Sequence, residues 1–409
     1  MESSDVVIVG AGHAGLSIGR ALAALGIDHV ILERDRIGQA WRSRWDSFCL
    51  VTPNWLIDLP EGAYDGDDPD SYMARDEIVA FLERYAAAGE TPVREDVQVL
   101  AARTLDDGFA LETSQGPIRA RVLVVASGAY QRPHLPNGAA AIADVLHTAD
   151  ATTYRRPDEL PDGGVLIVGS GQTGVQFAEE LHEAGRDVVL SCGKAPWLPR
   201  RFGGHDVTWW AEATGFLGQP VGSLPDPSAR LWANILATGH GGGHDLHYRT
   251  LQRDGVTLAG HFVGVDGSVV EFADDLAATV AWGDERYEQF GQMVRRVVTE
   301  RGLDPVELEP PPPFVADAPT EVPLERFETV LFTGGFRPDY GRWLPWPDAF
   351  DEQGFPIQTD GESGVVDGLY FMGVHFLRTR KSSILWGAND DATVVAGRIA
   401  MRLGAGQAG

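Results

Sequence analysis

Apolar residues along the chain gather in short strand-like runs that alternate with helix-periodic stretches. Residues 6–9 (VVIV) and 165–168 (VLIV) are such runs, and each is followed by a glycine-rich turn and an amphipathic helical stretch. A further apolar run follows each helix and ends near residues 33 and 192. Strand, turn, helix and strand in this order predict a parallel βαβ unit. Because the chain repeats the unit, we expect an α/β fold with two doubly wound domains.

The first glycine turn has the spacing that a dinucleotide phosphate requires. Gly10 permits a tight bend, Gly12 lets the backbone approach a pyrophosphate, and Gly15 lets the helix pack on the strand. The helix presents unpaired N–H groups and its positive dipole end to the phosphates, with Ala14 in contact. Glu33 follows Gly10 by 23 residues, where a carboxylate can accept hydrogen bonds from a ribose diol. We therefore predict a Rossmann-like site for FAD, whose ribose carries no 2′-phosphate.

The second glycine turn repeats this spacing without the acid. Its predicted dinucleotide contacts are Gly169, Gly171, Gln172, Thr173 and Gly174. Cys192 stands at the position that matches Glu33, and basic side chains follow at Lys194, Arg200 and Arg201. An acid would repel a 2′-phosphate whereas basic groups pair with one, so we predict NADPH rather than NADH. The alternative is that these basic groups are only solvated and the site takes either cofactor.

Two further strand-and-glycine segments, residues 122–136 and 329–339, flank the second unit. Each is an apolar strand followed by a glycine turn, as expected of paired crossovers between a domain and another inserted into it. We predict an NADP-binding domain at 156–318, inserted into an FAD-binding domain split between 1–155 and 319–409. The crossover residues predicted to contact FAD are Ser127, Gly128 and Gly335.

Three other segments narrow the class of protein. They are IGQAWRSRWD (37–46), LVTPNWLIDLP (50–60) and the C-terminal stretch 368–400. They resemble the G-x-W-x-x-R segment, the flavin-facing loop and the third FAD segment of the class B flavin-dependent monooxygenases. The resemblance covers residues 1–205 and 320–405. It implies further FAD contacts from Arg34, Gly38, Trp41, Arg44, Val97, Gly373 and Leu385.

Within that group, the chain is most similar in character to the flavin-containing monooxygenases and the CzcO-like bacterial flavoproteins. The resemblance implies that NADPH reduces FAD, that molecular oxygen adds at flavin C4a, and that oxygen passes to a nitrogen or sulfur atom. A Baeyer–Villiger or oxidative-decarboxylating monooxygenase is an alternative, and so is an NADPH oxidase or flavin reductase without oxygen transfer. The narrow signature of the flavin-containing monooxygenases is incomplete, because Tyr154 follows His147 by seven residues rather than four.

The resembling family needs no protein nucleophile, so the predicted catalytic residues are polar groups near the flavin. They are Thr52, Asn54 and Gln172. Thr52 and Asn54 flank Pro53, so a structural turn is the alternative for both. For Gln172, the alternative is that it only lines the second phosphate turn.

The composition limits which binding partners and which cellular location we expect for the protein. A formal charge of −26 over 409 residues disfavours nucleic acid and anionic membrane surfaces as partners. No apolar run approaches the ~18–20 residues of a membrane helix, no secretory signal precedes residue 6, and the two cysteines form no C-x-x-C pair. We expect a cytoplasmic protein that acts on a small organic molecule and oxygen, with a homodimer as an open alternative. The Gly-Gly-His-Asp stretches at 203–206 and 242–245 are predicted to be binding or structural loops rather than a metal site.

Overall fold

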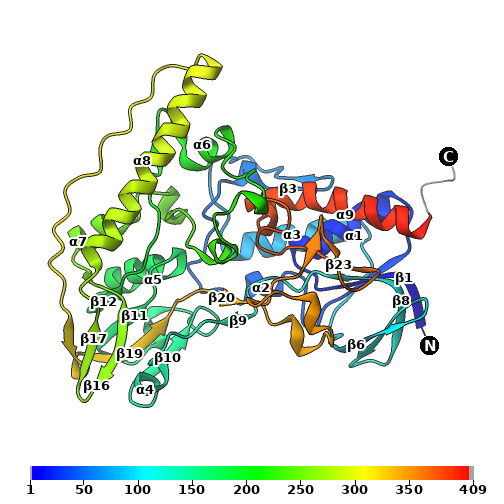
Figure 1. Cartoon of the computed structure of the whole chain (residues 1–409), viewed down its shortest axis with the longest axis horizontal. Helices are drawn as coiled ribbons and strands as arrows, with labels where there is room; N and C mark the ends of the chain where they lie inside the picture. Colours follow the sequence, from blue (N-terminus) through cyan, green and yellow to red (C-terminus); the bar gives the residue numbers. More distant parts are fainter. Residues whose placement is uncertain (1, 405–409) are drawn as a thin grey trace.

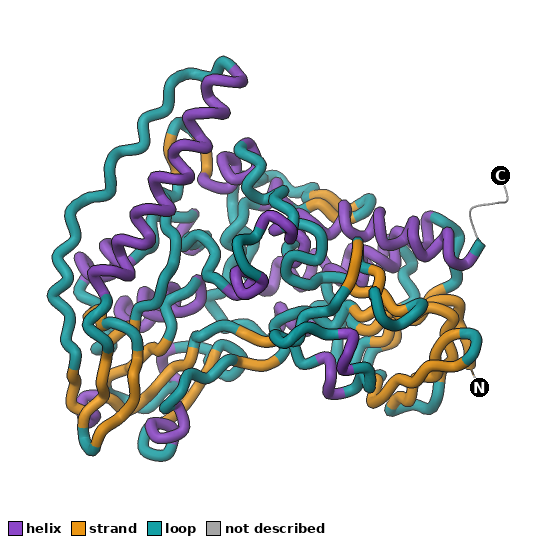
Figure 2. The backbone as a smooth tube through the Cα atoms, viewed as in Figure 1, coloured by secondary structure: helices purple, strands orange, loops and turns teal. Residues whose placement is uncertain are grey.

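The computed structural model describes residues 2–404 and has two α/β lobes side by side (Figure 1). The chain leaves the first lobe through β9 (Arg132–Pro133) and returns through β20 (Phe336–Arg337), and these two strands pair antiparallel. Most strands lie low in each lobe with most helices above them (Figure 2). The paired crossovers expected at 122–136 and 329–339 therefore form the junction between the lobes.

The first lobe is built on a mixed sheet whose central strands are parallel. β1 (Glu2–Val9) lies between β2 (His29–Leu32) and β8 (Ile118–Val125), and β8 pairs in parallel with β23 (Leu369–Phe371). The remaining strands of this sheet are β5 (Val93–Arg94), β6 (Val99–Leu105), β7 (Gly108–Thr113), β21 (Gln358–Thr359) and β22 (Glu362–Ser363). Val6, Val7 and Ile8 of β1 are fully buried, as expected of a strand covered on both faces.

Three helices run together along one face of this sheet (Figure 1). They are α1 (His13–Ala24), α3 (Arg75–Ala88) and α9 (Ala388–Leu403). The helix α9 packs on α1, although the two are far apart in sequence. The short elements of this lobe are α2 (Gln39–Arg42), β3 (Asp58–Leu59) and β4 (Gly62–Ala63). The C-terminal segment is thus a part of the first lobe, next to the first glycine turn.

The second lobe has a five-stranded parallel sheet in the order β10-β19-β11-β12-β15. The strands are β10 (His147–Asp150), β11 (Gly164–Val168), β12 (Val188–Ser191), β15 (Thr257–Ala259) and β19 (Phe327–Phe332). Two of them, β10 and β19, lie outside the predicted range 156–318. The difference has a simple cause: β11 needs a partner on each side, and the apolar run of β19 supplies one before the chain crosses back.

Helices and a small antiparallel sheet complete the second lobe. The helices are α4 (Ala139–Ala143), α5 (Gln172–Glu183), α6 (Val207–Ala213), α7 (Tyr248–Asp254) and α8 (Leu276–Arg301). The remaining strands are β13 (Arg201–Phe202), β14 (His205–Asp206), β16 (Phe262–Asp266), β17 (Val269–Phe272) and β18 (Glu321–Pro323). After α8, the proline-rich residues 309–314 form neither helix nor strand and run along the outer side of this helix (Figure 1).

The two lobes are joined by side chains as well as by the crossovers. Trp45, from the first lobe, is buried in the core of the second, with its ring 4.8 Å from that of Phe177. Glu180 of α5 accepts hydrogen bonds from Ser47 Oγ at 2.8 Å and from Tyr154 Oη at 2.9 Å. Burial raises the pKa of Glu180. These contacts hold α5 against the loop that follows α2.

The buried imidazole of His247 generates a stability prediction. His247 Nδ1 accepts a hydrogen bond from the N–H of Thr250 at the start of α7, and burial lowers the pKa of His247 from 6.5 to about 4. Between these values the unfolded chain binds a proton that the folded protein does not, so stability falls as the pH drops through this window. We expect His247→Gln to flatten that part of the profile, measured as the free energy of urea unfolding from about pH 7 to about pH 4.5. The exposed His147→Gln is the control, and an unchanged slope in His247→Gln would contradict the prediction.

Candidate active site between the lobes

The first glycine turn has the geometry of a phosphate cradle. Gly10 has a φ of +108°, and a Cβ there would lie 2.6 Å from the carbonyl oxygen of Ala126. A Cβ on Gly15 would overlap the carbonyl oxygen of Gly10. In contrast, a Cβ on Gly12 would meet nothing within 4 Å. Gly10 and Gly15 are therefore required by packing, whereas Gly12 leaves open space at the N-terminus of α1.

Glu33 lies at the end of β2, beside this open space. Its side chain is buried, with Oε2 accepting the N–H of Ala11 at 2.8 Å and Oε1 accepting the N–H of Asp35 at 3.1 Å. The backbone N–H of Val97 donates to the carbonyl oxygen of Glu33 at 2.8 Å. Each carboxylate oxygen can accept a further hydrogen bond. A ribose diol is a group of the right kind to supply it.

Other residues predicted to contact FAD surround the same turn. Gly38, with φ +71°, donates its N–H to the carbonyl oxygen of Ala11 at 3.0 Å. A Cβ on Gly373 would lie 2.7 Å from Cβ of Ala14. Leu385 is buried just before α9, and Arg34 is exposed and paired with Asp35. Ser127, Gly128 and Gly335 lie in the crossovers between the lobes.

The buried groups beyond Gly12 show whether FAD fits here. The ring of Trp41 lies 6.0 Å from that of His13 and 5.8 Å from that of Phe48. His13 Nε2 and Arg44 Nε are buried and have no hydrogen-bond partner among residues 2–404. Burial lowers the pKa of both side chains, that of His13 to about 4. Unpartnered buried polar atoms beside an open glycine fit a polar group bound at this place, as the phosphates and flavin of FAD would be.

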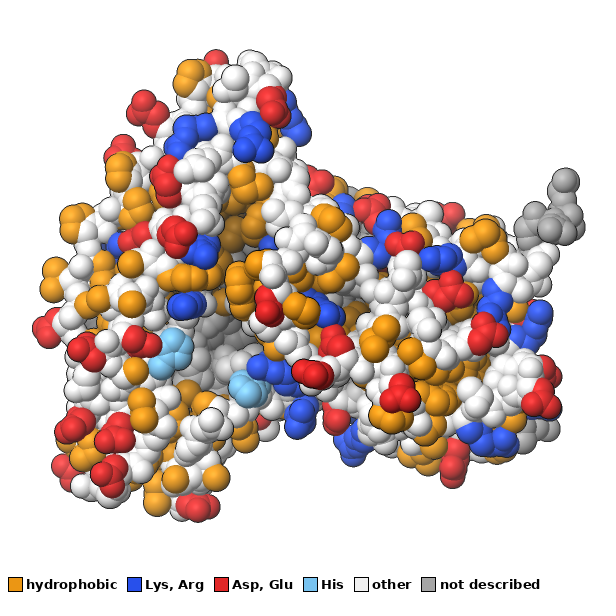
Figure 3. Space-filling view, in the orientation of Figure 1, with side chains coloured by type: hydrophobic (Ala, Val, Ile, Leu, Met, Phe, Trp, Pro, Cys, Tyr) orange, Lys and Arg blue, Asp and Glu red, His pale blue; other side chains and the backbone are white. Residues whose placement is uncertain are grey.

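Two aromatic side chains that the sequence analysis did not single out belong to the same region. The Tyr130 ring lies 5.4 Å from the Arg44 guanidinium and 4.9 Å from the His375 ring, yet 49% of its surface is exposed. His375 Nδ1 is 2.8 Å from Ser383 Oγ, and burial lowers the pKa of His375 to about 4. Figure 3 shows a hollow between the two lobes. Their positions in the sequence could have indicated these residues, since Tyr130 lies two residues after Gly128 and His375 lies two residues after Gly373.

The second glycine turn repeats the geometry of the first. Gly169 has a φ of +109°, and a Cβ there would lie 2.7 Å from the carbonyl carbon of Thr333. A Cβ on Gly174 would overlap the carbonyl oxygen of Gly169. At Gly171, the nearest atom to an added Cβ is Cβ of Ala233 at 3.8 Å, an ordinary contact distance. The N-terminus of α5 is therefore accessible to a second dinucleotide, with Thr173 in the first turn of the helix.

The three predicted catalytic residues differ in how far their side chains are already hydrogen-bonded within the protein. Asn54 is buried, with Oδ1 accepting the N–H of Met73 at 2.8 Å and Nδ2 donating to the carbonyl oxygen of Asp68 at 3.0 Å. Gln172 Nε2 donates to the carbonyl oxygen of Ala237, and its Oε1 accepts the N–H of Ala237 at 3.1 Å. Thr52 is half-buried. Both amides therefore hold loops in place, and a role for Thr52 in catalysis stays a prediction.

The basic residues after β12 also differ from one another. Lys194 is exposed, three residues beyond the end of the strand. Arg200 is only 2% exposed, and it donates to Asp206 Oδ2 at 2.8 Å and to the carbonyl oxygen of Val51 at 2.8 Å. Arg201 donates to the carbonyl oxygens of the glycine loop 242–243 at 2.8 Å. Both arginines are thus committed to internal contacts, which leaves Lys194 as the basic group available at this end of β12.

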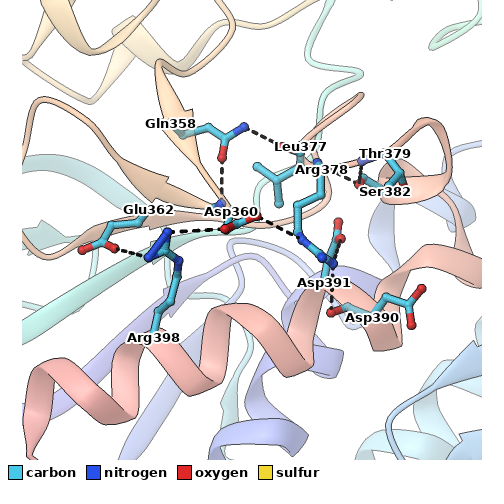
Figure 4. A network of polar contacts seen from close by, with 11 residues as sticks. Gln358, Asp360, Glu362, Leu377, Arg378, Thr379, Ser382, Asp390, Asp391 and Arg398 are labelled. Atoms are coloured by element: carbon cyan, nitrogen blue, oxygen red, sulfur yellow. Dashed lines mark hydrogen bonds and ion pairs between the residues drawn. The ribbon is translucent and has the colours of Figure 1, made fainter. Parts of the chain in front are cut away.

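A polar network fixes the C-terminal segment against α9 (Figure 4). Arg378 Nε lies 3.4 Å from Asp360 and its Nη1 lies 3.3 Å from Asp391, while Arg398 reaches Asp360 and Glu362. Burial raises the pKa of Asp391 to about 6. Ser382 Oγ accepts the N–H of Arg378 at 3.1 Å. The network positions the loop that carries His375 and Leu385 beside the first glycine turn.

A segment of the second lobe covers this C-terminal loop. The backbone N–H of Arg380 donates to the carbonyl oxygen of Gln219 at 2.9 Å, and the backbone N–H of Lys381 donates to the carbonyl oxygen of Leu217 at 3.1 Å. Trp386 Nε1 donates to Glu212 Oε2 at 3.0 Å. Residues 212–221 of the second lobe therefore lie over residues 378–386 of the first.

Other chemistries find little support in the described residues. Cys49 and Cys192 are buried, and burial raises the pKa of both thiols, that of Cys49 to about 11. Thiols of this kind are poor nucleophiles for disulfide exchange. Residues 2–404 hold no group of three His, Cys, Asp or Glu side chains that could bind a metal ion. No helix among them is long and apolar enough to cross a membrane.

Comparison with known proteins agrees with this geometry. Residues 7–207 match the pyridine nucleotide-disulphide oxidoreductase family. An uncharacterised CzcO-like oxidoreductase of Geobacillus kaustophilus is 29% identical over 95% of this chain and 96% of its own length. The indole-3-pyruvate monooxygenase YUCCA4 of rice is 30% identical over 53% of this chain and 57% of its own. A flavin-containing monooxygenase structure from Stenotrophomonas maltophilia shares the fold, with TM-score 0.69 and 19% identity over 98% of this chain and 100% of that one.

These matches agree with the predicted resemblance to the class B flavin-dependent monooxygenases. The predicted fold of two doubly wound dinucleotide-binding domains is confirmed. The matched family model and the CzcO-like relative are both oxidoreductases, in agreement with the predicted class of enzyme. Proteins that share a fold differ in substrate, so these similarities do not assign a substrate to this chain.

The contrast between two glycines of the first turn gives a direct test of the FAD site. Gly12 has an allowed φ of −79° and open space around it, so Gly12→Ala is expected to change the stability of the apoprotein by less than about 1 kcal/mol. The added methyl group would still occupy the space of the pyrophosphate and weaken FAD binding. Gly15→Ala is the matched control, expected to destabilise the apoprotein by about 2–3 kcal/mol through overpacking. Urea unfolding and FAD titration check both variants, and unchanged FAD affinity in Gly12→Ala would contradict the site.

Proposed function

We propose that this chain is an FAD-containing, NADPH-dependent monooxygenase that oxygenates a small organic molecule at a nitrogen or sulfur atom. The finer steps, an oxygen adduct at flavin C4a and its transfer to the substrate, are part of the proposal. The observation that carries it is the pair of accessible glycine turns, at Gly12 and Gly171, in two lobes that meet beside Arg44 and Tyr130. Relatives named as monooxygenases support the same reaction class.

The residues around the first turn have defined tasks in this proposal. The backbone from Gly10 to Gly15 holds the FAD pyrophosphate, and Glu33 accepts hydrogen bonds from the ribose. Arg44 Nε donates to a polar atom of the cofactor, which relieves a buried unpartnered donor. His13 stays neutral, since burial lowers its pKa to about 4. FAD, when bound, supplies the hydride acceptor and the reaction with oxygen.

The second lobe binds NADPH and keeps the reacting atoms dry. The turn from Gly169 to Gly174 holds its pyrophosphate, and Lys194 pairs with the 2′-phosphate. The cover of residues 212–221 over residues 378–386 limits the entry of water, which would otherwise release hydrogen peroxide. Thr52 remains a proposed flavin contact, while Asn54 and Gln172 act as positioning residues through the loops that they hold.

The charge of the chain supports the remaining parts of the proposal. At −26, it favours a small uncharged or cationic substrate over nucleic acid or an anionic membrane. We propose a cytoplasmic location because Cys49 and Cys192 are both free thiols, as expected in a reducing compartment. A homodimer stays an open prediction, to be measured by light scattering.

A two-step stopped-flow experiment tests the proposed reaction. The holoenzyme is reduced anaerobically with NADPH and, separately, with NADH, and is then mixed with aerated buffer while flavin spectra are recorded. We expect faster reduction by NADPH and a long-lived spectrum distinct from oxidised and reduced flavin. That spectrum should decay faster when an amine or a sulfide is added, because oxygen then passes to the substrate.

Each alternative gives a different result in the same experiment. Direct return to oxidised flavin with stoichiometric hydrogen peroxide, in the presence of amines, sulfides and ketones, would indicate an oxidase. Faster decay with a ketone alone would indicate a Baeyer–Villiger enzyme. Equal reduction rates with NADH and NADPH would contradict the proposed cofactor preference.

A further inference from the structure

The two glycine-turn units have the same strand pairing, so residues around the first site have counterparts at the second. In each unit, the strand before the turn pairs in parallel with the strand after the helix, and that strand pairs with a third. Leu32 lies beside Arg94 in the first unit, and Ser191 lies beside Ala259 in the second. These two pairs occupy the same place in the two units. Each residue that follows them in the first unit can therefore be matched with one residue in the second.

The comparison shows a change of charge at the second site. Three positions at the carboxyl ends of the first unit's outer strands are acidic, namely Glu33, Asp35 and Asp96. Their counterparts in the second unit are Cys192, Lys194 and His261. The first site thus has three carboxylates at these positions, whereas the second site has a thiol, an ammonium group and an imidazole. Carboxylates suit a ribose diol, whereas cations suit a phosphate.

The imidazole of His261 is held in a fixed orientation toward this rim. Its Nδ1 lies 2.6 Å from Asp275 Oδ2, and its backbone N–H donates to Asp275 Oδ1 at 3.0 Å. A Cβ on Gly193 would lie 3.4 Å from His261 Nε2, so the free edge of the ring faces the loop that carries Lys194. The ring is 52% exposed and accessible to a ligand. When the imidazole is protonated, Nε2 donates toward the space beside Gly193 and Lys194.

We propose that His261, held by Asp275, binds the 2′-phosphate of NADPH together with Lys194 and thereby sets the preference for NADPH over NADH. This inference rests on the proposed function in one respect, that the second turn binds a nicotinamide dinucleotide. It assigns the phosphate to the ends of β12 and β15 rather than to Arg200 and Arg201, which are committed to internal contacts.

Calorimetric titration of the holoenzyme with two nucleotide fragments tests the assignment without turnover. Adenosine 2′,5′-bisphosphate carries the 2′-phosphate, and 5′-AMP lacks it. We expect His261→Gln to weaken binding of the bisphosphate about tenfold, the value of a charge-assisted hydrogen bond, and to change binding of 5′-AMP less than about twofold. His261→Arg should retain the preference, and His261→Asp, which installs the acid found at Asp96, should abolish it.

A second histidine provides a matched control. His244 is also exposed and also paired with a carboxylate, Glu179 Oε1 at 2.6 Å, so His244→Gln should leave both affinities unchanged. Tight bisphosphate binding by the wild type that persists in His261→Gln would overturn the role of His261 and leave the proposed function intact. Failure of the wild type to bind either fragment would contradict both.

Discussion

The constraint on which the proposed function depends is that the two lobes, each with its own glycine turn, are held in one position relative to each other. In the proposed reaction, a hydride passes between two cofactors that are bound by different lobes and must be in contact. The two chain crossovers alone would let the lobes move, so further contacts between the lobes are needed. Trp45 anchors a loop of the first lobe in the core of the second, and Glu180 bonds to that loop and to Tyr154. The buried Arg200 adds a charge-assisted link from the second lobe to the carbonyl oxygen of Val51. Removing one partner of such a buried pair leaves an uncompensated charge, which makes these links costly to break.

The two lobes are proposed to bind different dinucleotides, and the residues next to each glycine turn account for the difference. The same glycine spacing builds both turns, because the close approach of helix and strand has the same steric requirement in each. What differs is the set of residues that follow the strands next to each turn, where Glu33, Asp35 and Asp96 of the first lobe correspond to Cys192, Lys194 and His261 of the second. The C-terminal segment returns to the first lobe, and residues 212–221 of the second lobe lie over it. The junction between the lobes is thus built from parts of the chain that are far apart in sequence.

The glycine turns and the insertion of one domain into another could be predicted from the sequence, because the motifs that indicate them consist of residues close together in the chain. The domain limits could not, since β19 pairs with β11 across more than 150 residues. The hydrogen bonds of Asn54 and Arg200 to other protein groups could not be predicted either. The sequence around a polar residue does not show whether its partner is a cofactor or the protein itself. Tyr130 and His375 come together only through the fold.

The most direct test of the central claim is a kinetic isotope effect on anaerobic flavin reduction. The holoenzyme would be mixed with NADPH that carries deuterium at either face of nicotinamide C4. The account predicts that deuterium at one face slows reduction and that deuterium at the other does not, because the two lobes fix a single orientation of nicotinamide against flavin. Equal rates with both labelled cofactors and with unlabelled NADPH, over all cofactor concentrations, would contradict the claim that the two turns bring both dinucleotides into contact.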